Sequence, residues 1–196
     1  RIDHVVAHSG VAWWSADDND GNERVDDESA AYGSRGSVLE VPAAEFVTAS
    51  SRLGAMHHSA VQLLLPRLPR GKGGSYTFVT SRESMLAMPR AGMAQINAHA
   101  VMGLAAALRQ EAAHESWPFA RVNELRLGDG MQINRSQFER ERAPRSRPLT
   151  HDIGDIVAGM VAASDGTNAG QPISASTPQE LEAVRLQYEA KQQRRG

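Results

Sequence analysis

The sequence has no cysteine and few aromatic residues, and each scarcity removes a class of function. Without cysteine the chain cannot form a disulfide, use a thiolate nucleophile or bind zinc through thiolates. Only 5% of its residues are aromatic, so no base-stacking platform stands out. The 21 basic and 23 acidic residues give a net charge of −2, which argues against a partner such as nucleic acid or an anionic membrane.

Long apolar runs and metal-binding signatures are lacking as well. No segment approaches the roughly 20 apolar residues of a membrane helix, and no signal peptide opens the sequence. No phosphate-loop, EF-hand or His-Glu-x-x-His pattern occurs. We therefore expect a cytoplasmic protein with no membrane association and no metal site.

Apolar patterning then indicates a single α/β domain over residues 1–196. Strands and helices alternate along the chain, which predicts a doubly wound parallel sheet of the Rossmann-like kind, with right-handed crossovers. Strands are expected at 2–7, 75–80, 121–127 and 170–175, and helices at 42–65, 93–113, from 150 and at 178–195. The helix at the end of the chain is a charged amphipathic tail within 178–196.

Other segments lack a regular apolar pattern. Residues 15–37 predict an exposed loop, 70–74 a turn, and 130–148 a solvated helix or lid. Ligands of doubly wound sheets bind at the carboxyl ends of the strands. The loops expected at that edge are 8–12, 80–92 and 127–147.

Several segments, in the right order and spacing, resemble the short-chain dehydrogenase/reductase (SDR) superfamily. Residues 2–10 are similar to its fourth strand and following turn, and 66–81 to its fifth strand, which ends at the catalytic Ser. Residues 121–128 resemble its sixth strand, and 152–157 with 170–173 its closing helix and strand. The resemblance implies the C-terminal two-thirds of an SDR domain, with an N-terminal portion preceding the apolar strand at 2–7. Without that portion, this strand is expected to be an exposed apolar edge.

The sequence also departs from the family pattern. The Gly-rich turn that holds the cofactor pyrophosphate is absent. Counted from Ser81, the positions of the family's catalytic Tyr and Lys are occupied by Ala94 and Ala98. The Tyr donates a proton to the substrate oxygen and the Lys lowers its pKa, and alanine does neither. The resemblance therefore implies a divergent member with a degenerate active site.

Candidate catalytic residues are Ser81, which matches the family's catalytic Ser, and His99 with the nearby Asn97. An imidazole titrates near neutral pH, so His99 is a possible replacement acid or base. The alternative, polar side chains on a helix surface, stays open. The neighbouring His57 and His58 are expected at surface or interface positions.

Candidate cofactor-binding residues follow the first and third strands. They are His8, Ser9, Gly10, Gly128 and Asp129. Glycine permits a close backbone approach to a ligand, although a plain turn explains these glycines too. The cofactor that the resemblance implies is NAD(P).

Three functions remain open. The first is NAD(P)-dependent oxidation or reduction of a small alcohol or carbonyl, implied by the resemblance. The second is a cofactor-independent isomerase, lyase or cyclase on the same scaffold, and the third is a non-catalytic pseudoenzyme or subunit. In each case the resemblance implies a homo-oligomer, a dimer or tetramer, formed through the helices at 43–65 and 93–113.

Overall fold

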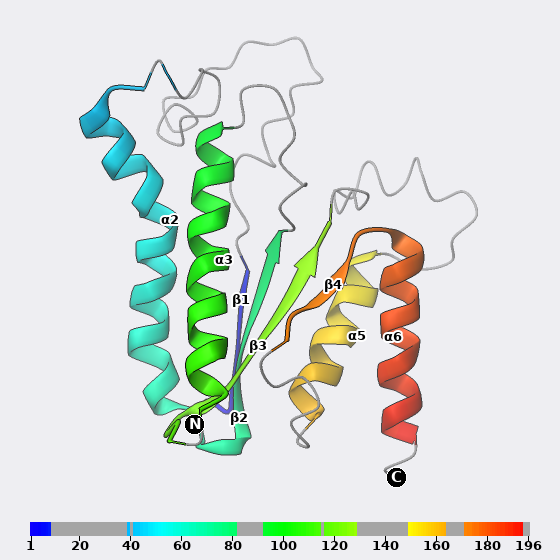
Figure 1. Cartoon of the computed structure of the whole chain (residues 1–196). Coiled ribbons are helices and arrows are strands. Elements are labelled where there is room, and N and C mark those ends of the chain that lie inside the picture. Colours follow the sequence, from blue (N-terminus) through cyan, green and yellow to red (C-terminus); the bar gives the residue numbers. More distant parts are fainter. Residues whose placement is uncertain are drawn as a thin grey trace.

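The computed structural model describes residues 1–8, 39, 41–81, 92–114, 116–128, 149–163 and 171–193 (Figure 1). The loops expected at 15–37 and 130–148 lie outside the described residues. So do the candidate site residues Ser9, Gly10 and Asp129.

The described elements alternate between strands and helices, as the sequence predicts. In chain order they are β1 (His4–His8), α2 (Ala43–Leu64), the 3-10 turn η3 (Leu65–Arg67), β2 (Gly71–Ser81), α3 (Gly92–Ala112), β3 (Ala120–Leu127), α5 (Leu149–Ala162), β4 (Ile173–Ala175) and α6 (Pro178–Gln193). The strands form one sheet in the order β1-β2-β3-β4, and each neighbouring pair is parallel. This confirms the predicted α/β, Rossmann-like fold.

The strand boundaries differ from the prediction, and the last strand, expected at 170–175, begins only at Ile173. His8, expected in a turn, is the last residue of β1 and pairs with Val79. The turn expected at 70–74 is wrong because β2 already begins at Gly71, which pairs with Ala120. Its Gly-rich sequence is accommodated by a register shift between Gly71 and Ser75. Gly71 has a φ of 62°, a conformation that favours glycine.

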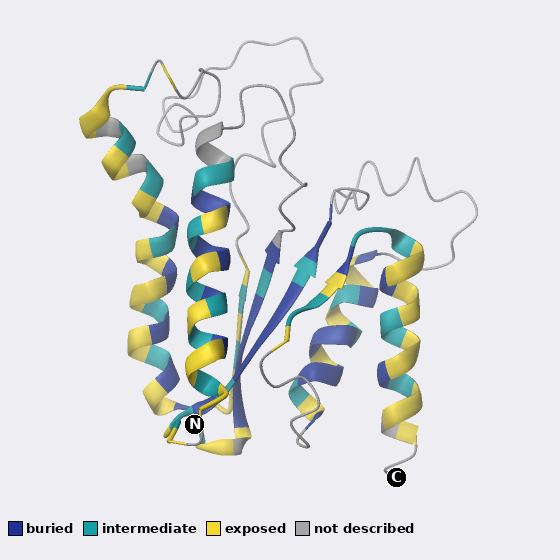
Figure 2. Cartoon of the chain, in the orientation of Figure 1, coloured by how far each residue is buried: buried dark blue, intermediate teal, exposed yellow. Residues whose placement is uncertain are grey.

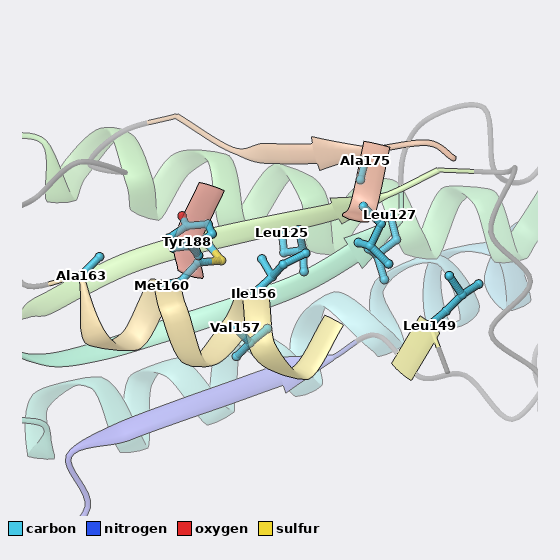
Figure 3. Packing of buried hydrophobic residues seen from close by; sticks show 10 residues of the cluster. Leu125, Leu127, Leu149, Ile156, Val157, Met160, Ala163, Ala175 and Tyr188 are labelled. Atoms are coloured by element: carbon cyan, nitrogen blue, oxygen red, sulfur yellow. The ribbon is translucent and has the colours of Figure 1, made fainter. Parts of the chain in front are cut away.

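Helices cover both faces of the sheet, and each face has its own apolar cluster (Figure 2). On one face α2 and α3 pack over β2, where Tyr76 and Phe78 are almost completely buried. On the other face Ile156 and Met160 of α5 pack against Leu125 of β3 (Figure 3). Side chains that alternate along the strands therefore pack into two apolar cores, one on each face of the sheet.

The crossovers between strands do not all have the same hand. The chain moves across the sheet in one direction, from β1 through to β4. Helices α2 and α3 lie on one face, whereas α5 lies on the other (Figure 1). The β3–α5–β4 crossover therefore has the hand opposite to the first two. Our expectation of uniformly right-handed crossovers fails here, because the apolar side chains of α5 match the Leu125 face of β3.

Strand β1 forms one edge of the described sheet. Its exposure alternates, with Val5 and Ala7 packed against the α2–α3 side and Val6 49% exposed on the other. Ile2, just before the strand, is 51% exposed. The expected exposed apolar edge is thus present in the part of the chain that the structure describes. Within that part, no helix is both long enough and apolar enough to cross a membrane.

Candidate active site at the carboxyl edge of the sheet

The strand register places three candidate residues along one edge of the sheet. His8 ends β1 opposite Val79, Ser81 ends β2 opposite Leu127, and Gly128 follows Leu127 directly. His8 is exposed and therefore accessible to a ligand. The side chain of Ser81 lies outside what the structure describes.

A topological switch point lies between β2 and β3. The chain leaves β2 toward α3 on one face of the sheet, and it leaves β3 toward α5 on the other. In open α/β sheets, ligands bind in the crevice formed where adjacent strands send their connections to opposite faces. Ser81 and Gly128 flank this point, so it is the part of the edge best suited to hold a substrate.

Gly128 is explained by strand packing. Its backbone N–H donates a hydrogen bond of 2.8 Å to the carbonyl of Ala175. A Cβ atom at position 128 would lie only 2.6 Å from the Cα atom of Ser176. Glycine is thus required at this position by the close approach of β3 to the end of β4, independently of any cofactor.

Asn97 and His99 lie on α3 but face different surroundings. Asn97 is buried, and its Oδ1 accepts a hydrogen bond of 3.3 Å from the backbone N–H of Leu53 in α2. His99 is exposed, and its Nδ1 lies 2.8 Å from the carbonyl oxygen of Gln95. A carbonyl can only accept, so Nδ1 carries the hydrogen and Nε2 carries the lone pair of the neutral ring. The structure therefore brings Asn97 to the helix interface and leaves His99 open to solvent.

The position expected for the family's Lys is part of the interior. Ala98 of α3 is 8% exposed. Its methyl group offers neither a proton nor a positive charge, so it cannot assist a proton donor at the carboxyl edge. Ala94 lies among residues whose side chains are not described.

A cluster of buried charged residues lies near the switch point and was not predicted from the sequence. We call Thr80, Arg109, Glu124 and Arg126 the Glu124 cluster. The Oε1 atom of Glu124 accepts from Thr80 Oγ1 at 2.9 Å and from Arg126 Nε at 2.9 Å. Its Oε2 atom accepts from Arg109 Nε at 2.9 Å and from Arg126 Nη2 at 3.2 Å. A fully buried carboxylate is thus held by two guanidinium groups and a hydroxyl.

The sequence does contain a signal for this cluster. Glu124 and Arg126 alternate with Leu125 and Leu127 in a largely buried strand. Charges two residues apart in a strand share a face, and on a covered face they need partners. Arg109 is one such partner, but its distance along the sequence gives no hint of the contact.

His57 is buried, so the predicted surface position is wrong. It follows Leu53 by four residues and therefore shares the inner face of α2. Its ring lies 6.3 Å from that of Phe78, and its Nε2 has no hydrogen-bond partner among the described residues. Burial, and to a smaller extent the nearby His8, lower the pKa of His57 below its ordinary value. At neutral pH this imidazole is uncharged.

The sequence matches no family model and no curated protein. Solved structures do match. The enoyl-acyl-carrier-protein reductase of Plasmodium berghei, solved with triclosan, has a TM-score of 0.57 at 16% identity over 90% of this chain. A small-chain dehydrogenase in complex with NADPH has a TM-score of 0.53 at 17% identity over 94% of the chain. A short-chain dehydrogenase/reductase family protein has a TM-score of 0.52 at 14% identity over 89%.

These matches concern only part of each similar protein. The chain covers 57% of the enoyl reductase, 74% of the small-chain dehydrogenase and 66% of the third protein. At such low identity the likeness concerns the fold alone. The parallel sheet, its two helical layers and these neighbours together show that the chain has an SDR-like fold.

Proposed function

We propose that this chain is an SDR-type oxidoreductase that transfers a hydride between NAD(P) and a small carbonyl or alcohol. The observation that carries the proposal is the position of Ser81, which ends β2 beside the β2–β3 switch point of an SDR-like sheet. The active site departs from the family pattern, since Ala98 is buried where that pattern has a Lys.

The residues at the edge fit one end of the cofactor. His8 is exposed at the end of β1, and Gly128 lies farther along the same edge, so these residues would flank the nicotinamide. No described residue is assigned to the pyrophosphate. When bound, the cofactor supplies the hydride. The chain's own part is to hold the substrate oxygen through a hydrogen bond from the Ser81 hydroxyl and to provide a proton at that oxygen.

The proton comes from water or from His99. His99 is exposed, and its Nδ1 is tied to the Gln95 carbonyl, so Nε2 is the nitrogen that would exchange the proton. The double variant Ser81→Ala/His99→Ala tests both roles. We expect it to lose turnover while cofactor binding is retained, and unchanged turnover would remove both residues from the mechanism.

Cofactor binding by the whole 196-residue chain is the direct test of the proposal. NADPH and NADH are titrated separately, and energy transfer from the three Trp residues to the reduced nicotinamide is recorded. We expect saturable transfer that is weakened by His8→Ala and unchanged by His114→Ala. His114 is an exposed histidine that lies just after α3. The absence of saturable transfer with either cofactor would rule out a working dehydrogenase.

A cofactor-independent isomerase, lyase or cyclase is the second candidate. The observation that favours it is the buried Ala98, because a site without the Lys has no obvious means of activating a proton donor for carbonyl reduction. Turnover that persists without nicotinamide would select this function. If neither turnover nor cofactor binding is found, the third candidate, a non-catalytic subunit, remains.

We also propose a homo-oligomer that forms through α2 and α3. These helices pack closely, since a Cβ atom on Gly54 would lie 3.1 Å from Ala100 Cβ. Outside this contact α2 exposes Met56 and Leu63, at 59% and 58%. The two are seven residues apart and therefore share one face of the helix. Exposed apolar residues on one face are typical of a protein contact surface.

A further inference from the structure

The carboxylate of Glu124 contacts two guanidinium groups, those of Arg109 and Arg126. Both oxygens of Glu124 already accept from two donors each. A ligand that approaches the cluster therefore meets guanidinium N–H groups and not the carboxylate.

Arg126 is the member of the cluster that reaches solvent. Its side chain is 21% exposed, compared with 6% for Arg109 and 0% for Glu124. Arg126 contacts Glu124 through Nε and Nη2, which occupies one edge of its planar guanidinium group. The outer end of the Arg126 guanidinium group, which carries Nη1, has no hydrogen-bond or ion-pair partner among the described residues. Such an end can donate two parallel hydrogen bonds to one oxyanion.

The position of Arg126 connects it with the candidate active site. It pairs with Thr80, the residue before Ser81, and it lies two residues before Gly128. Arg126 is therefore next to the β2–β3 switch point, where ligands of such sheets bind. Glu124 fixes the guanidinium there before any ligand arrives, which lowers the conformational entropy lost on binding.

We propose that Arg126 binds an oxyanion, a carboxylate or a phosphate group, of the ligand that occupies the β2–β3 switch point. The inference rests on the proposed function, because it takes this ligand to be the substrate of the proposed reaction. The substrate is then a carbonyl or hydroxyl compound that also carries an acidic group. Glu124 acts as the positioning residue for Arg126, and Arg109 neutralises Glu124 from the buried side.

The test measures anion binding by the whole chain, without cofactor or turnover. Thermal unfolding is followed in increasing sodium phosphate, sodium malonate, and sodium chloride of matched ionic strength. We expect at least one of phosphate and malonate to raise the melting temperature saturably above the chloride series. The probe that does so more strongly identifies phosphate or carboxylate as the preferred group.

Variants then assign the effect to Arg126. Arg126→Gln is expected to abolish the anion-specific stabilisation, while Arg70→Gln keeps it, because Arg70 precedes β2 at the opposite edge of the sheet. Arg126→Lys retains the charge but cannot contact Glu124 and an oxyanion with the same planar group, so we expect about tenfold weaker binding. It also serves as the test if Arg126→Gln does not fold.

Two outcomes would overturn the inference. One is a wild-type response to phosphate and malonate no larger than to chloride, and the other is an anion response that Arg126→Lys leaves unchanged. The result is separable from the proposed function. If NADPH and NADH do not bind but the response depends on Arg126, the oxidoreductase proposal fails and the oxyanion site stands.

Discussion

Gly159 of α5 lies directly against the ring of Tyr188 in α6. A Cβ atom at position 159 would be 2.7 Å from Tyr188 Cδ1 and 2.8 Å from its Cβ and Cγ. Tyr188 is itself 6% exposed and belongs to the α5–α6 apolar cluster, so the ring has little room to move (Figure 3). The absence of a side chain at 159 sets how closely the two helices approach.

Gly159→Ala should therefore destabilise the fold, by about 1–3 kcal/mol, because overpacking forces α5 and α6 apart. Urea unfolding measures the change. The matched control is Gly154→Ala on the same helix, where a Cβ atom meets nothing within 4 Å. That change should stabilise the protein by up to about 1 kcal/mol, since alanine favours helix more than glycine does. Equal effects of the two substitutions would contradict the packing argument.

Arg109→Met should lower the free energy of unfolding by about 3 kcal/mol, because it removes a guanidinium from a buried carboxylate. Among the described residues, Glu124 would then keep Arg126 and Thr80 as partners. The control is Gln110→Met, an exposed neighbour on α3 that should change stability by less than about 0.5 kcal/mol. Denaturant unfolding of both variants measures the change in the free energy of unfolding. A decrease for Arg109→Met as small as that for the control would show that the ion pair does not contribute to stability.

His57 should make the protein less stable in mild acid. Its pKa in the folded chain lies below the ordinary value of 6.5, so the unfolded chain takes up this proton first as the pH falls. The contribution of neutral His57 to stability is present above about pH 6.5 and is lost as the pH falls toward the folded pKa. The nearby His8 adds to the lowering of the His57 pKa, and the ring of Phe78 lies 6.3 Å from that of His57.

The measurement is the free energy of unfolding between about pH 7.5 and pH 5. His57→Leu should show a shallower loss of stability than the wild type, because it removes the titrating group and an unpaired buried nitrogen. His58→Leu, at the exposed neighbouring position, should follow the wild type. A wild-type slope in His57→Leu would assign the acid sensitivity to other groups.

Met56→Glu/Leu63→Glu should convert the proposed oligomer to monomers, because two buried and unpaired carboxylates oppose association. Light scattering after size-exclusion chromatography gives the mass of each species. The control Gln62→Glu adds a charge to an exposed neighbouring position of α2 and should leave the mass unchanged. A wild-type chain that is monomeric at all concentrations would refute the oligomer itself.

The order of elements was predictable because both periodicities are strong in this sequence. Leu53 and Val61 recur at helical spacing and are buried in α2, and the buried Leu65 follows at the same spacing in η3. Val122 and Leu125 lie in a strand that Gly128 follows directly, and both are buried. The β2 boundary was not predictable, because Gly71 pairs through its backbone and carries no side chain to mark it.

The hand of the last crossover could not be read from the sequence. A period of two places Val122 and Leu125 on opposite faces but does not say which helix covers which face. The Glu124 cluster was missed for a related reason. Its members come from β2, α3 and β3, and only the packed geometry brings Arg109 to Glu124.

The separation of the two apolar clusters by the sheet has a consequence for how substitutions combine. Phe78 and Met160 belong to different clusters on opposite faces of the sheet, and the two clusters have no residue in common. Free-energy changes at sites without common neighbours add within a few tenths of a kcal/mol. The α2–α3 side and the α5–α6 side should therefore accept substitutions independently, so that one face of the molecule can diverge while the other continues to hold the sheet together.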